Sequence, residues 1–162
     1  MKKLFLSIAL FIAMLFSTQA QLKELVIKKG GRGLYLEHTV APKEGLYSIG
    51  RLYNVHPKFI AAYNHVDIAK GLNVDPVIHI PLTDTNFTQK SKKGTPVYYS
   101  VMEAQGLMKV SNAVNKVTLK DLRSWNGIKN DNLSVGSKLI VGFLVSREMS
   151  ALASKAPAKQ TP

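Results

Sequence analysis

The sequence predicts an α+β protein made of two small βααβ units, and a repeated phrase is the first observation behind this prediction. The segment HPKFIAAYNH at residues 56–65 returns as TLKDLRSWNG at residues 118–127, with an aromatic residue and Asn in matching places. The second observation is that the flanks of the phrase repeat too, with helix-like and strand-like patterns in the same order. Self-similarity over a whole unit is typical of a duplicated structural module.

An apolar stripe predicts the first helix of each unit, in EGLYSIGRLYNV (44–55) and in QGLMKVSNAVNKV (105–117). Apolar side chains at offsets of 0, 3, 6 and 7 share one face of a helix. Gly45 and Gly106 stand where these helices begin, a position at which glycine is acceptable. The stripes consist of Leu46, Ile49, Leu52 and Tyr53 in the first unit and of Leu107, Val110, Ala113 and Val114 in the second.

The repeated phrase itself predicts the second helix of each unit. Pro57 suits a first helical position, and Thr118 with Asp121 three residues later resembles a capping box. Asn64 and Asn126 suit the helix exits, because Asn tolerates a left-handed backbone. Strand-like runs enclose the helices, namely LEHTVA and PVIHIP in the first unit and PVYYSV and KLIVGF in the second.

The segments outside the two units are predicted to be connections. Residues 21–36 form an N-terminal hairpin or extension that turns at Gly30 and Gly31. Residues 83–95 are polar and glycine-punctuated, which predicts a flexible linker. Residues 146–162 carry too little large apolar surface to order themselves, so we expect a disordered tail.

Residues 1–20 have the pattern of a secretory signal peptide, with Lys2 and Lys3 before an apolar core and small residues at its end. The alternative is an uncleaved membrane anchor, but the apolar run is short for a bilayer and no basic stop-transfer segment follows. The absence of cysteine excludes disulfides, thiolate metal sites and the lipid-bearing cysteine of a bacterial lipoprotein. We therefore expect a bacterial protein, secreted or periplasmic, with no membrane span after signal removal.

The chain is strongly basic, with a formal net charge of +12. Removal of the two signal lysines leaves 20 basic against 10 acidic residues. A basic surface favours polyanions. Export directs this preference away from nucleic acid and towards anionic wall polymers, peptidoglycan carboxylates or lipid phosphates. The alternative is that the charge only keeps the domain soluble.

Together these features resemble two lysin motif (LysM) repeats, at residues 37–82 and 96–145. The resemblance rests on HTV, the helix EGLYSIGRLYNV, the helix ending in YN and the strand IHIP, and then on YYSV, QGLMKVSNAVNKV, DLRSWNG and LSVGSKLIVG. It implies that two antiparallel strands lie on one side of two helices in each unit. It also implies association with the cell wall and binding of a glycan that contains N-acetylglucosamine, such as peptidoglycan or chitin.

The resemblance implies a shallow glycan groove between the loop before the first helix and the loop after the second helix. We call these loops the first groove loops (41–47 and 64–75) and the second groove loops (103–108 and 127–135). The expected glycan-binding residues are Lys43, Glu44, Gly45, Leu46, Tyr47, Leu72, Asn73 and Val74 in the first repeat, and Gln105, Gly106, Leu107, Met108, Leu133, Ser134 and Val135 in the second.

The groove loops depart from the family pattern in one respect. The family often has Gly-Asp-Thr before the first helix, whereas this chain has Lys43-Glu44-Gly45 and Ala104-Gln105-Gly106 at the corresponding places. The missing Thr hydroxyl removes a potential contact to sugar. The second repeat diverges further, because Met108 replaces the aromatic residue found at the matching place of the first repeat.

Other chemistries fit the sequence less well. The acidic residues are scattered, and a unit of this size has too small a core to hold two carboxylates across a deep cleft. Tyr63 and Trp125 end inward-facing helices, which predicts core positions rather than ligand stacking. We expect no enzymatic activity, no catalytic residue, no metal and no cofactor. No short metal-ligand spacing joins the four histidines, His38, His56, His65 and His79.

Three functions agree with these features. The leading hypothesis is a non-catalytic peptidoglycan-binding protein of the bacterial envelope. The alternative is a structural or interaction protein whose divergent LysM repeats bind an envelope protein. A third hypothesis is a basic protein that binds anionic polymers by charge alone.

Overall fold

The computed structural model describes residues 24–155 except 75 and 104. The predicted signal peptide and residues 156–162 lie outside the described residues. The helices are α2 (Leu46–Tyr53), α3 (Pro57–Asn64), α4 (Leu107–Ala113), α5 (Leu119–Asn126) and α6 (Arg147–Lys155). The strands are β1 (Leu25–Gly30), β2 (Gly33–Thr39), β3 (Val77–Pro81), β4 (Phe87–Thr88), β5 (Thr95–Ser100), β6 (Gln105–Gly106), β7 (Asn132–Leu133) and β8 (Lys138–Leu144). No helix in this part of the chain is long and apolar enough to cross a membrane.

Two βααβ-like units are present, as the repeat predicts. The first consists of β2, α2, α3 and β3, and the second of β5, α4, α5 and β8. The outer strands of each unit pair antiparallel, β2 with β3 and β5 with β8. Gly45 and Gly106 are the N-caps of α2 and α4, and Pro57 is in the first turn of α3. The Thr118 hydroxyl caps α5 by accepting the backbone N–H of Asp121 at 3.0 Å.

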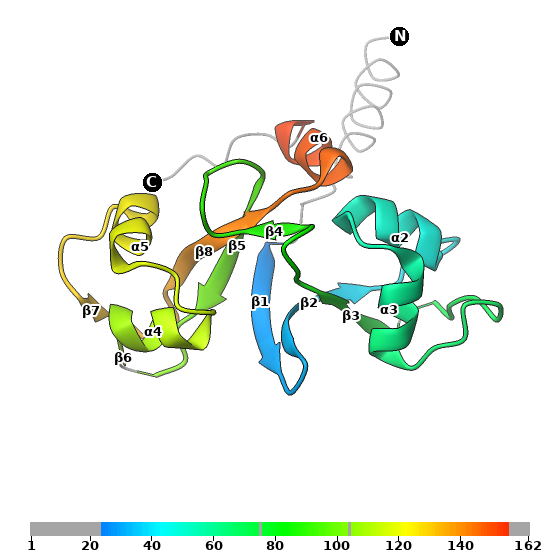
Figure 1. Cartoon of the computed structure of the whole chain (residues 1–162), viewed down its shortest axis with the longest axis horizontal. Coiled ribbons are helices and arrows are strands. Elements are labelled where there is room, and N and C mark those ends of the chain that lie inside the picture. The colour runs from blue at the N-terminus through cyan, green and yellow to red at the C-terminus, as the bar shows by residue number, and fades with distance from the viewer. Residues whose placement is uncertain (1–23, 75, 104, 156–162) are drawn as a thin grey trace, which may run out of the picture.

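The units do not form separate domains, because their strands share one six-stranded sheet in the order β3-β2-β1-β5-β8-β4 (Figure 1). Strand β1 makes the join. It pairs antiparallel with β2 on one side and parallel with β5 on the other, where Leu25 lies opposite Val97 and Val26 opposite Tyr98. The expectation of two units connected only by a linker is therefore wrong.

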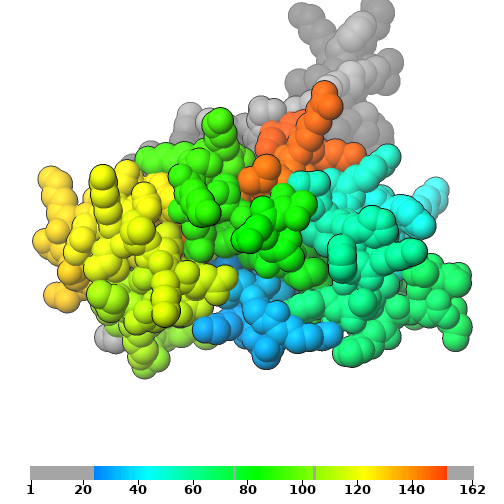
Figure 2. Space-filling view, viewed as in Figure 1, coloured from blue at the N-terminus to red at the C-terminus, as the bar shows by residue number. Residues whose placement is uncertain are grey.

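The predicted N-terminal hairpin is present, but its returning strand is also the opening strand of the first unit. Strand β2 serves both purposes, and the two-residue turn consists of Gly31 and Arg32 between the paired Gly30 and Gly33. Figure 2 shows the hairpin, in blue, between the two repeats on this face of the molecule. The hairpin therefore lies where it can contact both repeats.

The prediction of a flexible linker over residues 83–95 is wrong, because this segment is packed into the fold. It contains β4, which pairs with β8. Asn86 is fully buried, and its side-chain oxygen accepts the backbone N–H of Thr83 at 2.8 Å. At Gly142 an added Cβ would meet the Phe87 ring at 2.4 Å. A polar sequence concealed this packing, which depends on one buried Asn and one buried aromatic residue.

The prediction of a disordered tail over residues 146–162 is wrong for its first part, where Arg147–Lys155 forms α6. Met149 is buried, and Glu148 of α6 lies 3.4 Å from Arg51 of α2. The Ser146 hydroxyl, just before the helix, donates to the Leu52 carbonyl. A helix that follows the second repeat therefore packs on the first repeat and adds to the connection made by β1.

The repeated Asn makes the same set of hydrogen bonds in both units. The Asn64 amide donates to the Ile60 carbonyl at 2.8 Å and to the His79 carbonyl at 2.7 Å, and its oxygen accepts the His79 N–H at 2.7 Å. Asn126 does the same with Leu122 and Ile140, at 2.8, 2.9 and 2.7 Å. The left-handed residues at the helix exits are the next ones, His65 and Gly127. The two Asn side chains thus attach the second helix to the closing strand rather than ending the helix.

The aromatic residues that precede these Asn residues are half-buried, so the prediction of core positions holds only in part. The Trp125 ring packs edge-on against Phe143, with centroids 5.3 Å apart. Tyr63 lies beside Arg32, whose guanidinium is 4.3 Å from the ring centroid. The fully buried centre of each unit is aliphatic instead, and includes Ile49, Ile60 and Ile80 in the first unit and Val110, Leu122 and Val141 in the second.

We predict that Asn64→Ala and Asn126→Ala each lower the free energy of unfolding by about 2–4 kcal/mol. Each change removes three hydrogen bonds and leaves half-buried backbone groups without their partners. Urea denaturation followed by circular dichroism measures the loss. Asn112→Ala, at an exposed position of α4, is the control and should change stability by less than about 0.5 kcal/mol. A loss no larger than that of the control would show that the Asn hydrogen bonds contribute little.

Candidate functional site

The first groove loops meet at their bases. The backbone N–H of Val40, just before the first loop, donates to the Pro76 carbonyl at 3.0 Å, just after the second. Within the first loop Lys43 has a left-handed backbone with φ of 65°, and the loop ends at Gly45, where α2 begins. The structure therefore brings the two segments together at one end of the first unit, as the groove prediction requires. Asp75 lies outside the described residues.

Glu44 is held inside the loop. Its carboxylate accepts the backbone N–H of Ala41 at 2.9 Å and lies 2.7 Å from Nε2 of His38, whose Nδ1 is 2.9 Å from the Tyr53 hydroxyl. Burial, together with the negative charge of Glu44, raises the pKa of Tyr53 to about 12. The network fixes the loop and engages the Glu44 carboxylate, so Glu44 contributes to the groove chiefly by shaping it.

The first repeat offers two exposed apolar side chains at its groove loops. Tyr47 is 71% exposed and Val74 is 49% exposed. Leu46 belongs to the core, at 4% exposed, and Leu72 is half-buried. Of the apolar residues expected to bind glycan, Val74 and Tyr47 are therefore available to a ligand and Leu46 is not. The polar positions Lys43 and Asn73 are exposed, and Gly45 is half-buried.

The second groove loops are joined by a small sheet of their own. Strand β6 pairs antiparallel with β7, placing Gln105 opposite Leu133 and Gly106 opposite Asn132. Leu107 is buried in the core at 1% exposed, as the matching Leu46 is. Sequence reasoning missed the β6–β7 pairing, since two-residue strands carry no alternating pattern. Ala104 lies outside the described residues.

The exposed surface of the second groove loops is rich in methionine. Met108 and Val135 are 59% and 61% exposed, and Met102, which was not among the predicted residues, is 79% exposed. Met102 lies close by, because the adjacent Val101 carbonyl accepts the backbone N–H of Gly136 at 2.8 Å. Ser134 is exposed as well. Met102 directly precedes the loop at 103–108 in the sequence, and this position could have drawn attention to it.

The histidines do not gather. His38 and His79 lie on the partner strands β2 and β3, where His79 is opposite Glu37. His56 accepts the Lys58 backbone N–H as the N-cap of α3, and His65 follows the same helix. In the described part of the chain, no group of three or more His, Asp or Glu side chains could hold a metal ion.

Comparison with known proteins gives one family and a few partial relatives. The LysM domain profile matches residues 38–81 and 107–142. An autolysin of Enterococcus faecalis is 45% identical over 51 residues, which are 32% of this chain and 7% of the autolysin. The solved spore cortex-lytic enzyme SleL of Bacillus cereus aligns over 67% of this chain and 23% of its own length, at 24% identity and a TM-score of 0.33. SleL of Bacillus megaterium QM B1551 aligns over 65% of this chain and 22% of its own length, at 18% identity and a TM-score of 0.30. The chain thus spans less than a quarter of each of these proteins.

We predict that alkaline pH destabilises the protein through Tyr53. Its pKa is about 12 when folded and about 10 when unfolded, so the unfolded state loses this proton first. The contribution of Tyr53 to the free energy of unfolding is fully present below pH 10. It falls by about 2–3 kcal/mol as the pH rises to about 12. Guanidinium denaturation of the wild type and of Tyr53→Phe between pH 9 and 12 measures it.

In this experiment Tyr53→Phe should lose less stability than the wild type over the same pH range. Tyr47→Phe is the matched control, because the same hydroxyl is removed from a ring that is exposed rather than buried. Identical pH slopes for the wild type and Tyr53→Phe would contradict this account of Tyr53.

Proposed function

The chain belongs to the LysM family and carries two LysM domains, and from this premise we propose that it is a non-catalytic protein that binds the N-acetylglucosamine-containing glycan of peptidoglycan in the bacterial envelope. LysM domains typically bind peptidoglycan. The single observation that best supports the proposal is the pair of ordered loops in the first repeat, with Tyr47 and Val74 exposed beside them.

The chemistry of the first groove loops suits a sugar chain. The C–H faces of a sugar ring are apolar and can pack against the Tyr47 ring and Val74. The amide groups of N-acetylglucosamine need hydrogen-bond partners, which the backbone of an ordered loop can supply without further loss of conformational freedom. The Glu44 network keeps this loop ordered.

The proposal of a non-catalytic role rests on how acidic side chains are used. Glu44 is engaged by His38 and by the Ala41 backbone, and in the second repeat Asp131 pairs with Arg123 at 2.6 Å. Hydrolysis of a glycan by two carboxylates requires both of them to flank the bond. The match to an autolysin over 51 residues supports a setting at the cell wall, and it covers only 7% of that protein.

The shared sheet changes what two repeats can do together. The first groove loops lie at one end of the long axis of the molecule, and the second groove loops lie at the other end (Figure 1). A flexible linker would have let both repeats follow one glycan chain, but the six-stranded sheet holds them apart at a constant separation. We propose that the two ends engage separate stretches of the wall, or two strands.

The exposed methionines favour a second candidate function for the second repeat. Met102 and Met108 are flexible and polarizable, and surfaces of this kind adapt to varied protein partners. The second repeat would then bind an envelope protein while the first binds glycan. The two candidates differ in whether Met108 contributes to binding of purified wall.

We predict that Tyr47→Ala weakens binding of the full chain to purified, teichoic-acid-free peptidoglycan by about 5- to 30-fold. The change removes roughly 1–2 kcal/mol of apolar contact between the ring and a sugar face. Sedimentation isotherms measure binding, and Tyr47→Phe, which keeps the ring, should bind within about twofold of the wild type. Met108→Ala in the same assay separates the two candidates, because only glycan binding by the second repeat predicts a loss.

Two further measurements complete the experiment: the salt dependence of binding and the release of soluble wall fragments. Binding through the groove should largely survive 0.5 M salt, whereas binding by charge alone should fall steeply. No soluble wall fragments should be released. A wild-type chain that does not sediment with peptidoglycan would contradict the proposed function, and release of fragments that stops on mutation of one acidic residue would contradict a non-catalytic role.

A further inference from the structure

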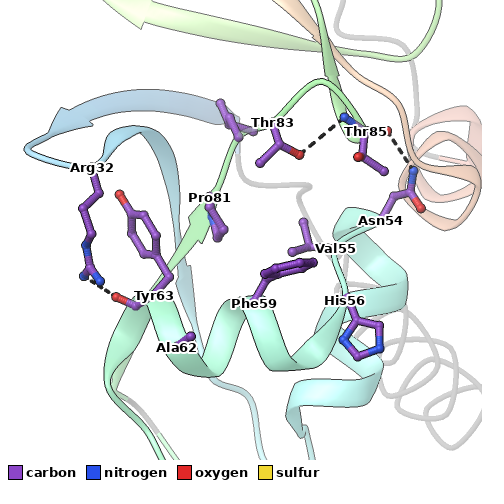
Figure 3. A pocket seen from close by; sticks show the side chains of 11 residues that line it. Arg32, Asn54, Val55, His56, Phe59, Ala62, Tyr63, Pro81, Thr83 and Thr85 are labelled. Atoms are coloured by element: carbon purple, nitrogen blue, oxygen red, sulfur yellow. Dashed lines mark hydrogen bonds between the residues drawn. The ribbon is translucent and has the colours of Figure 1, made fainter.

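A pocket of about 580 Å³ lies beside α3 in the first repeat (Figure 3). Its walls come from four parts of the chain: the exposed face of α3, the connection between α2 and α3, the turn between β1 and β2, and the end of β3 with the segment that follows it. None of the expected glycan-binding residues lines it. The turn and the β3–β4 segment are outside the residues that match the LysM domain, so this pocket is not a feature of a single LysM unit.

Aromatic rings form one side of the pocket. Phe59 and Tyr63 project from the same face of α3 towards the hollow, with Val55 and Pro81 nearby (Figure 3). Phe59 is 69% exposed, so the core does not need its ring. A pocket of this volume with an apolar floor is within the range that holds small ligands.

Arg32 gives the pocket a positive rim. Its guanidinium is 4.3 Å from the Tyr63 ring centroid and donates to the Tyr63 carbonyl, which holds the charge at the edge of the hollow. The lining residues include Arg32 and His56 but no Asp or Glu. Asp84 lies between two lining threonines in the sequence without lining the pocket itself. The charge of the rim therefore favours a ligand with a carboxylate.

The wall opposite α3 is held in place by two Asn side chains. The amide of Asn54 donates to the carbonyls of Thr85 and Val145 at 3.2 and 3.1 Å. Asn86 accepts the backbone N–H of Thr83 at 2.8 Å and donates to the Pro81 carbonyl at 3.2 Å. Thr83 and Thr85 thus keep their positions on the rim, and the pocket exists before a ligand arrives.

We propose that this pocket binds an amino sugar that bears a carboxylate. The apolar face of the sugar ring packs on Phe59 and Tyr63, its hydroxyl and acetamido groups meet the Thr85 side of the rim, and its carboxylate lies against Arg32. In peptidoglycan the sugar with this chemistry is N-acetylmuramic acid, which alternates with N-acetylglucosamine. The inference rests on the proposed function and adds to it a second, acidic recognition site on the first repeat.

The test is a nuclear magnetic resonance titration of the full chain with two matched probes, N-acetylmuramic acid and N-acetylglucosamine, which differ by the lactyl group that carries the carboxylate. N-acetylmuramic acid should shift the backbone amides of Val55, Phe59 and Tyr63 and bind about 2- to 5-fold more tightly than N-acetylglucosamine at low salt. Arg32→Gln should remove the difference between the probes, and Arg32→Lys should retain part of it. Lys120→Gln, an exposed change of the same charge on α5, should leave the difference unaltered.

Phe59→Ala should abolish the pocket shifts for both probes while leaving amides elsewhere at their wild-type positions, because its ring is exposed. Equal affinities for the two probes, shifts confined to the groove loops, or pocket shifts that survive Phe59→Ala would each overturn the proposal. Sedimentation with whole peptidoglycan distinguishes failure of the pocket proposal from failure of the proposed function. A chain that sediments but shows no pocket shifts refutes the acidic-sugar site alone, whereas a chain that does not sediment refutes the proposed function as well.

Discussion

The structure depends on strand β1 pairing on both of its sides. Strand β2 continues from β1 through a two-residue turn, so that pairing is local. The parallel pairing with β5 joins Leu25 to Val97 and Val26 to Tyr98, and it turns the separate two-stranded sheets of two repeats into one sheet. An exposed edge on either repeat would leave a row of backbone donors and acceptors unpaired. The strand satisfies both edges at once, and the buried segment around Asn86 and the helix α6 strengthen the same junction.

This junction decides how the two repeats act. Within each repeat, hydrogen bonds from one Asn side chain hold the second helix against the closing strand and so stabilise the βααβ unit. Between the repeats, the sheet fixes the direction in which each set of groove loops faces. The arrangement also creates the pocket beside Phe59, whose walls meet only because the hairpin and the β3–β4 segment pack against the first repeat. The junction is thus the source of the fixed separation between the groove loops and of the pocket walls that no single unit contains.

The sequence was informative where structure is local and repeated. Local patterns predicted all four helices of the units and the strands beside them. These patterns include the apolar stripe at Leu46 and Ile49, the proline at the start of α3, and the repetition of Asn64 as Asn126. It did not predict the β1–β5 pairing, because contacts between distant segments leave no periodic pattern in either one. The linker prediction failed because two buried residues order a polar segment. The family resemblance indicated which loops to compare, but burial of the leucines and exposure of Met102 depend on packing that only coordinates reveal.

Native-state hydrogen exchange of the full chain in increasing denaturant tests the central claim, that the two repeats form one cooperative structure. Amides of the pair β2–β3 and of the pair β5–β8 should reach the same free energy of opening, since losing one repeat exposes the β1–β5 edge of the other. Their exchange should merge into a single global isotherm. Two separate isotherms, with one repeat still protected after the other has opened, would show that the units fold independently and would contradict the account.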